Sequence, residues 1–224
     1  MNLLYVSIKA NSLVTGGSLC RKNNFLALKK TEITLFDYRI AVGRNPIIKI
    51  FLSMLNYKCG LSYFHTKKIV RFIKKNNIDC VFLDLSLYGK LAKEIKKCTE
   101  AKIVTFFHNC EYSIYSQSIK DNKFYKLLLK SVYVNECFSL KYSDICIFLT
   151  NRDYEDCKKF YKLDCKHIFT PISLERKYVF NNTVYYRTPK KLLFVGSYFY
   201  PNIHGLTWFI NFVLTKIDYT LTIV

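Results

Sequence analysis

Short apolar runs alternate with longer amphipathic runs along most of this 224-residue chain, and this alternation constrains the fold more than any other feature. The short runs are rich in β-branched and aromatic residues, which is typical of strands. The longer runs repeat apolar residues at helical spacing. Alternating strands and helices favour a parallel sheet with right-handed crossovers, so we expect an α/β, Rossmann-like domain.

Local composition predicts where the elements lie. The run IDCVFLD at 78–84 is almost continuously apolar, as in a strand buried on both faces. The run at 62–77 has an apolar side and a lysine-rich side, as in an amphipathic helix. A less regular stretch containing Gly43 and Pro46 precedes it. We expect strands at 3–8, 32–38, 78–84, 101–107 and 144–150, and helices at 18–29, 62–77, 86–97, 123–143 and after a cap at Asn151 or Asp153.

Polar residues and glycines follow four of the predicted strands. Ligands of parallel α/β sheets bind beyond the carboxyl ends of the strands, so these residues should lie on one rim. They are Gly16, Gly17 and Ser18 after the first strand, Asp84 and Ser86 after the third, His108, Asn109 and Glu111 after the fourth, and Thr150 and Asn151 after the fifth.

The adjacent glycines Gly16 and Gly17 are notable in a chain with seven glycines. A glycine pair lets the main chain adopt positive φ and lets another group approach closely. Ser18 is a good helix N-cap, and the free N–H groups of a helix start attract anions. An ordinary strand-to-helix turn is the alternative, and the shared rim favours a ligand site.

Composition limits the class of protein. Half of the residues are hydrophobic and 17% are aromatic, which supports a packed core. The nine cysteines show no C-x-x-C spacing, and several fall in apolar runs, so we expect buried free thiols in a reducing, cytoplasmic environment rather than disulfides or a zinc site. We expect neither a signal peptide nor a transmembrane helix, because no apolar run approaches about 18 residues.

The formal net charge of +19 would attract nucleic acid, anionic membrane or phosphorylated substrates. The basic residues are dispersed, however, and biased genome composition explains abundant Lys, Asn, Ile and Tyr equally well. Nucleic-acid binding is disfavoured, because the aromatic residues fall inside apolar runs and no known nucleic-acid motif is present.

The carboxy-terminal part predicts a second unit. Residues 181–189 have the composition of a linker, and 190–224 have the pattern strand, loop, helix, strand. We therefore expect a first domain at 1–180, a linker at 181–189 and one β-α-β unit at 190–224. One such unit leaves open sheet edges, so we expect it to pack on the first domain, to be completed by another chain, or to be a piece of a longer domain.

Three stretches together resemble the glycosyltransferase family 4 group, which has the GT-B architecture of two Rossmann-like domains. They are SIKANSLVTGGS, TFFHNCEYSIYS and LLFVGSYFYPNIHGLTWFI, of which the third is the most specific. The resemblance implies an amino-terminal acceptor domain and the start of a donor-binding domain. It also implies retaining transfer of a sugar from a nucleotide-sugar donor to a glycan or lipid-linked acceptor, in surface polysaccharide synthesis at the cytoplasmic face of the membrane.

The resemblance also implies roles for particular residues. Gly16, Gly17 and Ser18 would approach the donor diphosphate. His108 would contact the transferred sugar, and Glu111 would orient His108 or acceptor hydroxyls. Asp84, Ser86, Asn109, Thr150 and Asn151, with Gly196, Ser197 and Asn202 of the second unit, would line the cleft. No metal and no cofactor besides the nucleotide-sugar substrate is expected.

The chain departs from this family in the second domain. The acidic pair that contacts the donor in family members is absent from the sequence. We therefore expect little activity from this chain alone, as in a truncated or split enzyme. The alternative is a non-catalytic acceptor- or membrane-binding module, in which basic helices such as 62–77 rest on anionic lipid.

Overall fold

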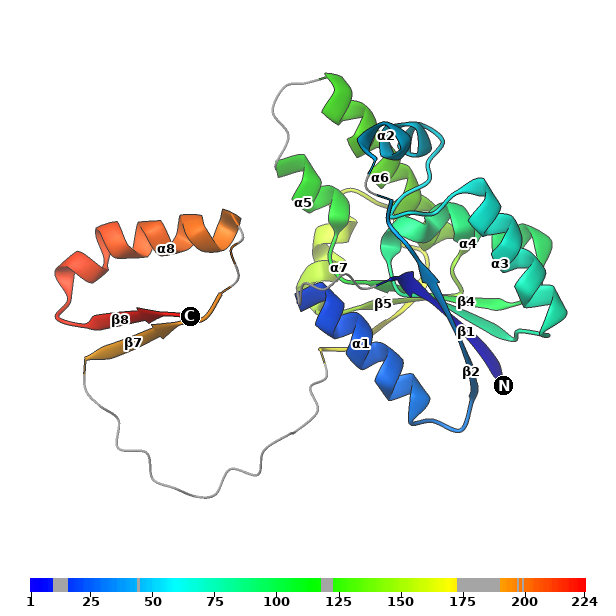
Figure 1. The fold of residues 1–224 in the computed structure, drawn as a ribbon, viewed down its shortest axis with the longest axis horizontal. Coiled ribbons are helices and arrows are strands. Elements are labelled where there is room, and N and C mark those ends of the chain that lie inside the picture. The colour runs from blue at the N-terminus through cyan, green and yellow to red at the C-terminus, as the bar shows by residue number, and fades with distance from the viewer. Residues whose placement is uncertain (10–15, 44, 118–122, 173–189, 197, 199) are drawn as a thin grey trace. The chain divides into compact units, whose positions relative to one another are not determined.

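The computed structural model describes residues 1–9, 16–43, 45–117, 123–172, 190–196, 198 and 200–224. The chain divides into two compact units, Met1–Glu175 and Arg176–Val224, and each is described by itself (Figure 1).

The first unit is built on one six-stranded sheet in which every strand pair is parallel. The spatial order is β2-β1-β3-β4-β5-β6. The chain adds β2 on one side of β1 and all later strands on the other side, so the strand order reverses between β1 and β3. This confirms the predicted α/β, Rossmann-like fold. The strands are β1 Asn2–Ile8, β2 Thr34–Ile40, β3 Cys80–Leu83, β4 Lys102–Phe107, β5 Ile145–Phe148 and β6 Lys166–Phe169.

Helices connect the strands and cover the sheet (Figure 1). They are α1 Gly16–Lys29, α2 Pro46–Met54, α3 Tyr63–Lys75, a short 3-10 helix at Ser86–Tyr88, α4 Gly89–Cys98, α5 Glu111–Gln117, α6 Lys123–Tyr142 and α7 Asn151–Lys158.

Two of these helices were not predicted. The stretch with Pro46, expected to be irregular, forms α2, because Asn45 Oδ1 accepts hydrogen bonds from the N–H groups of Ile47 at 2.9 Å and Ile48 at 3.3 Å. Pro46 occupies the first helical position, where its missing N–H costs nothing. Helix α5 follows β4 directly, and its first N–H groups are bound by Glu136, a residue distant in the sequence.

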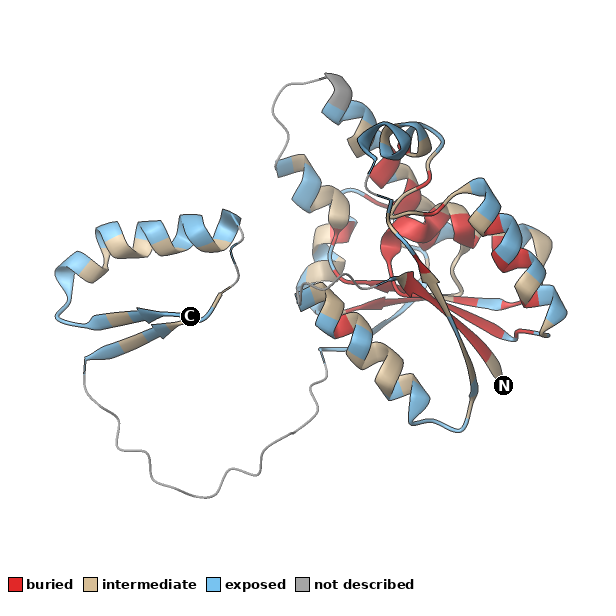
Figure 2. Ribbon diagram, viewed as in Figure 1, coloured by how far each residue is buried: buried red, intermediate tan, exposed pale blue. Residues whose placement is uncertain are grey.

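Side chains alternate between the two faces of the sheet. Leu4, Val81 and Ile103 belong to a core cluster that includes residues of α3, α4 and α6. Tyr5, Phe82 and Phe106 belong to another cluster, which includes Cys20 of α1. Figure 2 shows the buried residues concentrated in the strands and on the inner sides of the helices.

Helices α4 and α6 approach closely at Gly89. A Cβ atom on Gly89 would lie 1.8 Å from the Asn135 carbonyl oxygen and 2.8 Å from the Ser139 nitrogen. Next to this contact, Asn135 Oδ1 accepts a hydrogen bond from the Lys90 N–H at 3.0 Å. The glycine therefore allows a polar stripe of α6 to cap the start of α4.

We expect Gly89→Ala to lower the free energy of unfolding of the first unit by about 2 kcal/mol or more, because the added methyl group meets backbone atoms. Urea denaturation followed by circular dichroism measures this. Gly43→Ala is the matched control, since no atom of the residues that the structure describes lies within 4 Å of a Cβ at Gly43. Equal stability of the two variants would contradict the close approach.

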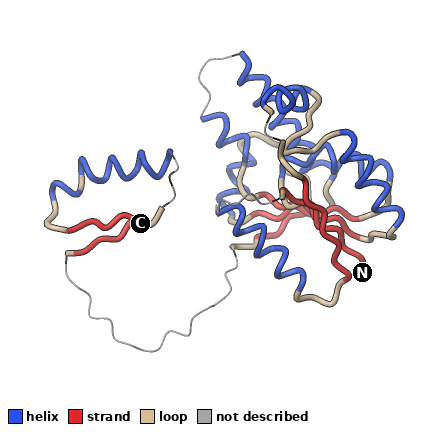
Figure 3. Tube along the Cα trace, in the orientation of Figure 1, coloured by secondary structure: helices blue, strands red, loops and turns tan. Residues whose placement is uncertain are grey.

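The second unit contains β7 Lys191–Phe194, α8 Tyr200–Phe212, a 3-10 helix at Leu214–Lys216 and β8 Thr220–Ile223 (Figure 3). The two strands are parallel, and Lys191 pairs with Thr220. None of the residues described in this unit is buried. The predicted bounds of the domains and linker, 1–180, 181–189 and 190–224, remain predictions.

Across the described ranges of both units, no helix combines the length and the apolarity needed to cross a membrane. All nine cysteines lie in these ranges and are free thiols. Five of them, Cys20, Cys80, Cys110, Cys146 and Cys157, are buried, and for Cys80 and Cys146 this confirms the prediction from their apolar runs.

Candidate functional site

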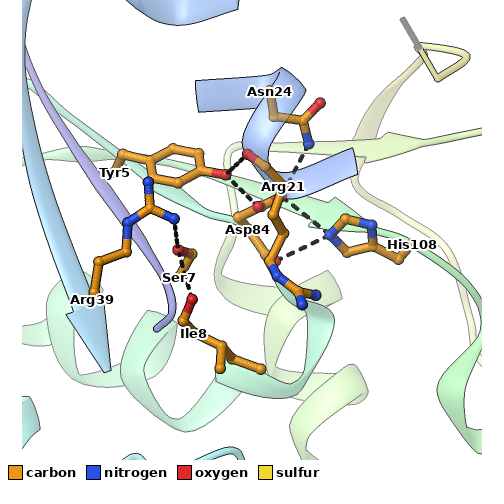
Figure 4. A network of polar contacts seen from close by, with 8 residues as sticks. All are labelled: Tyr5, Ser7, Ile8, Arg21, Asn24, Arg39, Asp84 and His108. Atoms are coloured by element: carbon orange, nitrogen blue, oxygen red, sulfur yellow. Dashed lines mark hydrogen bonds and ion pairs between the residues drawn. The ribbon is translucent and has the colours of Figure 1, made fainter. Parts of the chain in front are cut away.

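The rim of the sheet brings together residues that follow β3 and β4. His108 Nε2 lies 3.2 Å from Asp84 Oδ1 and 3.2 Å from the Asp84 main-chain oxygen. The two residues are 24 positions apart in the sequence, but β3 and β4 are adjacent parallel strands. The predicted meeting of these two strand ends is therefore observed (Figure 4).

The Asp84 carboxylate is fully buried and receives hydrogen bonds from three elements. The Tyr5 hydroxyl of β1 donates to Oδ2, and Asn24 of α1 donates to Oδ1 at 3.0 Å. His108 contributes the third contact. A buried carboxylate needs such partners, so this residue joins β1, α1, β3 and the end of β4 at one point.

The His108 imidazole is positively charged at neutral pH. Burial lowers its pKa, but the hydrogen bond and charge of Asp84 and a contact with the Cys20 thiol outweigh burial and raise the pKa to about 9. The residue is only 7% exposed, and it faces Asp84 and Cys20. The positive charge of His108 is therefore buried beneath α1. A residue that contacts a transferred sugar directly, as the resemblance implies, would be expected to lie nearer the surface.

Helix α1 begins at Gly16, two residues earlier than predicted. Gly16 and Gly17 therefore form the first turn of the helix rather than a loop before it, and Ser18 is inside the helix instead of at its cap. Among the described residues, no atom lies within 4 Å of a Cβ built on Gly16, and Gly16 is exposed. Packing of the described residues thus does not require glycine at this position.

Arg21 is a rim residue that the sequence analysis missed. Its Nη1 lies 3.4 Å from a Cβ built on Gly17, one helical turn earlier. Its charge also acts on Glu111 and Tyr88. Figure 4 shows its side chain extending from α1 alongside Asp84 and His108. The spacing of four between Gly17 and Arg21 was the available signal, because residues four apart share one face of a helix.

Glu111 is the first residue of α5 and lies at the same rim. Burial raises the pKa of Glu111, against the charges of His108 and Arg21 and a hydrogen bond from the Asn109 side chain. Of the predicted residues, Glu111 thus interacts with His108 and Asn109, and it also interacts with Arg21. Their catalytic or cleft-lining roles remain predictions.

Glu136 of α6 is the second residue that the sequence analysis missed. It is fully buried and accepts four hydrogen bonds, from Ser86 Oγ at 3.1 Å, Glu111 N at 3.0 Å, Tyr112 N at 3.0 Å and the Tyr161 hydroxyl at 2.8 Å. Burial raises its pKa to about 7, although the hydrogen bonds favour the charged form. Glu136 fixes the start of α5, which directly follows the His108 turn.

The other predicted cleft residues do not join this cluster. Ser86 is 1% exposed and donates to Glu136, so its side chain faces the core rather than an open rim. Thr150, rather than Asn151 or Asp153, caps α7 by accepting from the Asp153 N–H at 3.3 Å. Asn151 is exposed at the first position of α7.

In the second unit, two predicted residues lie close together. The Asn202 Nδ2 atom is 3.3 Å from a Cβ built on Gly196. Ser197 lies outside the described residues. Whether these residues line a cleft remains a prediction.

These features define a Rossmann-like α/β domain with a charged cluster at the carboxyl rim of its sheet. No protein-family model matches the chain. No curated protein matches it. Among solved structures, MurG of Acinetobacter baumannii matches with a TM-score of 0.48 and 10% sequence identity. That match covers 100% of this chain and 57% of the MurG chain, so the chain spans less than two thirds of the length of that structure.

Proposed function

We propose that the chain is a glycosyltransferase of GT-B type, similar to family 4, and that its first unit provides the acceptor side and part of the diphosphate contact. The observation that carries the proposal is the glycine start of α1, where Gly16 is exposed, beside the Arg21 guanidinium and above the protonated His108. Helix N-terminal N–H groups and an arginine are suited to a diphosphate.

In the proposed reaction, the bond between the anomeric carbon and the donor phosphate oxygen breaks. The acceptor oxygen bonds to that carbon on the same face, and the acceptor proton passes to the departing diphosphate. Arg21 and the first turn of α1 would stabilise the negative charge that develops there. His108, which is hydrogen-bonded to Asp84, would support this site by keeping a positive charge beneath the helix start.

The acceptor in this proposal is a glycan or a lipid-linked sugar, and the donor is a nucleotide sugar. Glu111 is the rim carboxylate suited to bind acceptor hydroxyls, since its N–H is fixed by Glu136 and its side chain lies near Arg21. The cytoplasmic location belongs to the same proposal, as does completion of the donor side by a second chain.

Titration of the ¹⁵N-labelled chain with uridine and guanosine diphosphate sugars tests the diphosphate contact. We expect amide shifts at Gly16, Gly17 and Arg21, and an affinity at least about tenfold weaker in Arg21→Ala. Lys22→Ala is the matched control, because Lys22 is the exposed neighbouring cation of α1. Shifts confined to other regions, or equal affinities of Arg21→Ala and wild type, would refute the site.

A radiolabelled transfer assay on the same variants separates the two functions left open by the sequence. Turnover that falls in Arg21→Ala supports a transferase. If glycan acceptors bind at the rim while no nucleotide sugar shifts α1, the chain is the non-catalytic acceptor-binding module instead.

A further inference from the structure

Helix α2 presents an apolar face to solvent. Its outward residues are each 47% to 73% exposed. Their spacing of one, three, three and one places them on a single side of the helix. They are Ile47, Ile48, Phe51, Met54 and Leu55, which we call the α2 face. A cluster of exposed apolar side chains of this kind often marks a site that binds another molecule.

The inner side of this helix is small and mixed in character, because Leu52 packs against the main core cluster and Ser53 is buried. Ser53 is 7% exposed and faces the protein. Lys58 Nζ, just after the helix, lies 3.4 Å from Ser53 Oγ and donates to the Leu128 carbonyl of α6 at 3.3 Å. The helix is therefore attached through Leu52 and these polar contacts, and the five residues of the α2 face are left outside.

The sequence on either side of α2 is basic. Residues 38–78 contain nine Lys or Arg residues and no Asp or Glu: Arg39, Arg44, Lys49, Lys58, Lys67, Lys68, Arg71, Lys74 and Lys75. Helix α2 packs against α6, in which residues 123–135 contain three lysines and again no acidic residue. Lys49 on α2 and Lys130 on α6 are exposed.

We propose that the α2 face inserts into the headgroup region of an anionic lipid bilayer, with Lys49 and Lys130 on lipid phosphates. An apolar helical face flanked by basic residues is the pattern of an interfacial helix. The nine residues of α2 span about 14 Å, which suits a helix lying in the plane of the membrane. A second copy of the chain is a poorer occupant, because pairing two α2 faces would oppose two basic surfaces.

This inference does not depend on the proposed transferase activity. Cosedimentation of the full chain with phosphatidylcholine vesicles containing about one third phosphatidylglycerol tests it. We expect binding that falls at least about tenfold in Ile47→Ser/Phe51→Ser, and also falls about tenfold in Lys49→Glu/Lys130→Glu or on pure phosphatidylcholine. The matched control is Ile168→Thr, a half-exposed isoleucine on β6, which should bind as wild type does.

A site-specific probe locates the contact. Trp208 is the single tryptophan of the chain, so Phe51→Trp in a Trp208→Phe background reports from α2 alone. We expect a blue shift of its fluorescence on anionic vesicles and none on neutral vesicles. Absence of wild-type binding would overturn the proposal, as would binding unaffected by the serine variant. A serine variant that dissociates a dimer without losing vesicle binding would assign the α2 face to a second copy.

Discussion

Replacing Asp84 with alanine is expected to lower the free energy of unfolding by about 3 to 5 kcal/mol, because it removes the charge partner of a buried cation and an acceptor shared by two further donors. The donors are the Tyr5 hydroxyl and the Asn24 amide, and the cation is His108. Urea denaturation of the full chain at neutral pH measures the loss. Asn24→Ala removes one donor and leaves the charge pair, so it should cost only about 1 kcal/mol.

The pH dependence of stability gives this prediction a second test. His108 has a folded pKa of about 9 against an ordinary value of 6.5, so its contribution is complete below pH 6.5 and is lost as the pH rises to about 9. The shift corresponds to about 3 kcal/mol at most. The wild-type stability should therefore fall between pH 7 and 9, and His108→Gln should flatten this fall. An equally steep fall in that variant would show that His108 does not pair with Asp84.

Replacing Glu136 with alanine is the second change with a large expected effect, again about 3 to 5 kcal/mol. It removes the acceptor of four hydrogen bonds, of which those from Ser86 and Tyr161 are buried and those from the first two N–H groups of α5 are partly buried. Glu136→Gln should cost less, because one amide oxygen still accepts. Tyr161→Phe, which removes a single donor, should cost about 1 kcal/mol.

Amide hydrogen exchange shows where the loss of Glu136 acts. The N–H groups of Glu111 and Tyr112 should exchange faster in Glu136→Ala, whereas amides of β1 and β3 should change only with global stability. The pKa of Glu136 is about 7 in the folded chain against an ordinary value of 4.5. The stability that comes from protonation of its buried carboxyl is therefore present below pH 4.5 and is lost as the pH rises to about 7. Glu136→Gln should remove this slope. Unchanged exchange at Glu111 and Tyr112 would mean that Glu136 does not hold α5.

The sheet and part of the rim could be predicted because they depend on local patterns. Apolar runs indicate strands, and adjacent parallel strands bring Asp84 and His108 to one edge whatever the loops do. Helix α2 was missed because it is apolar on its outer side and lacks the polar face by which a surface helix is recognised. Its cap, Asn45 followed by Pro46, was the only local signal.

Glu136 could not be predicted, because its partners come from three segments that meet only when α6 packs beside α4 and α5. Sequence spacing within α6 does not indicate which backbone groups lie opposite. Gly16 and Gly17 were recognised as unusual, but their place in the first helical turn depends on where the helix begins, which local composition defines only to within a few residues.

The second unit has an exposed apolar surface and no buried residue among those described, so little of its own burial energy is available to oppose chain entropy. Its melting temperature should therefore depend on what covers that surface, the first unit or another chain, and in the second case it should rise with the concentration of that chain, as mass action requires. The second unit would then be stably folded only while its apolar surface is covered.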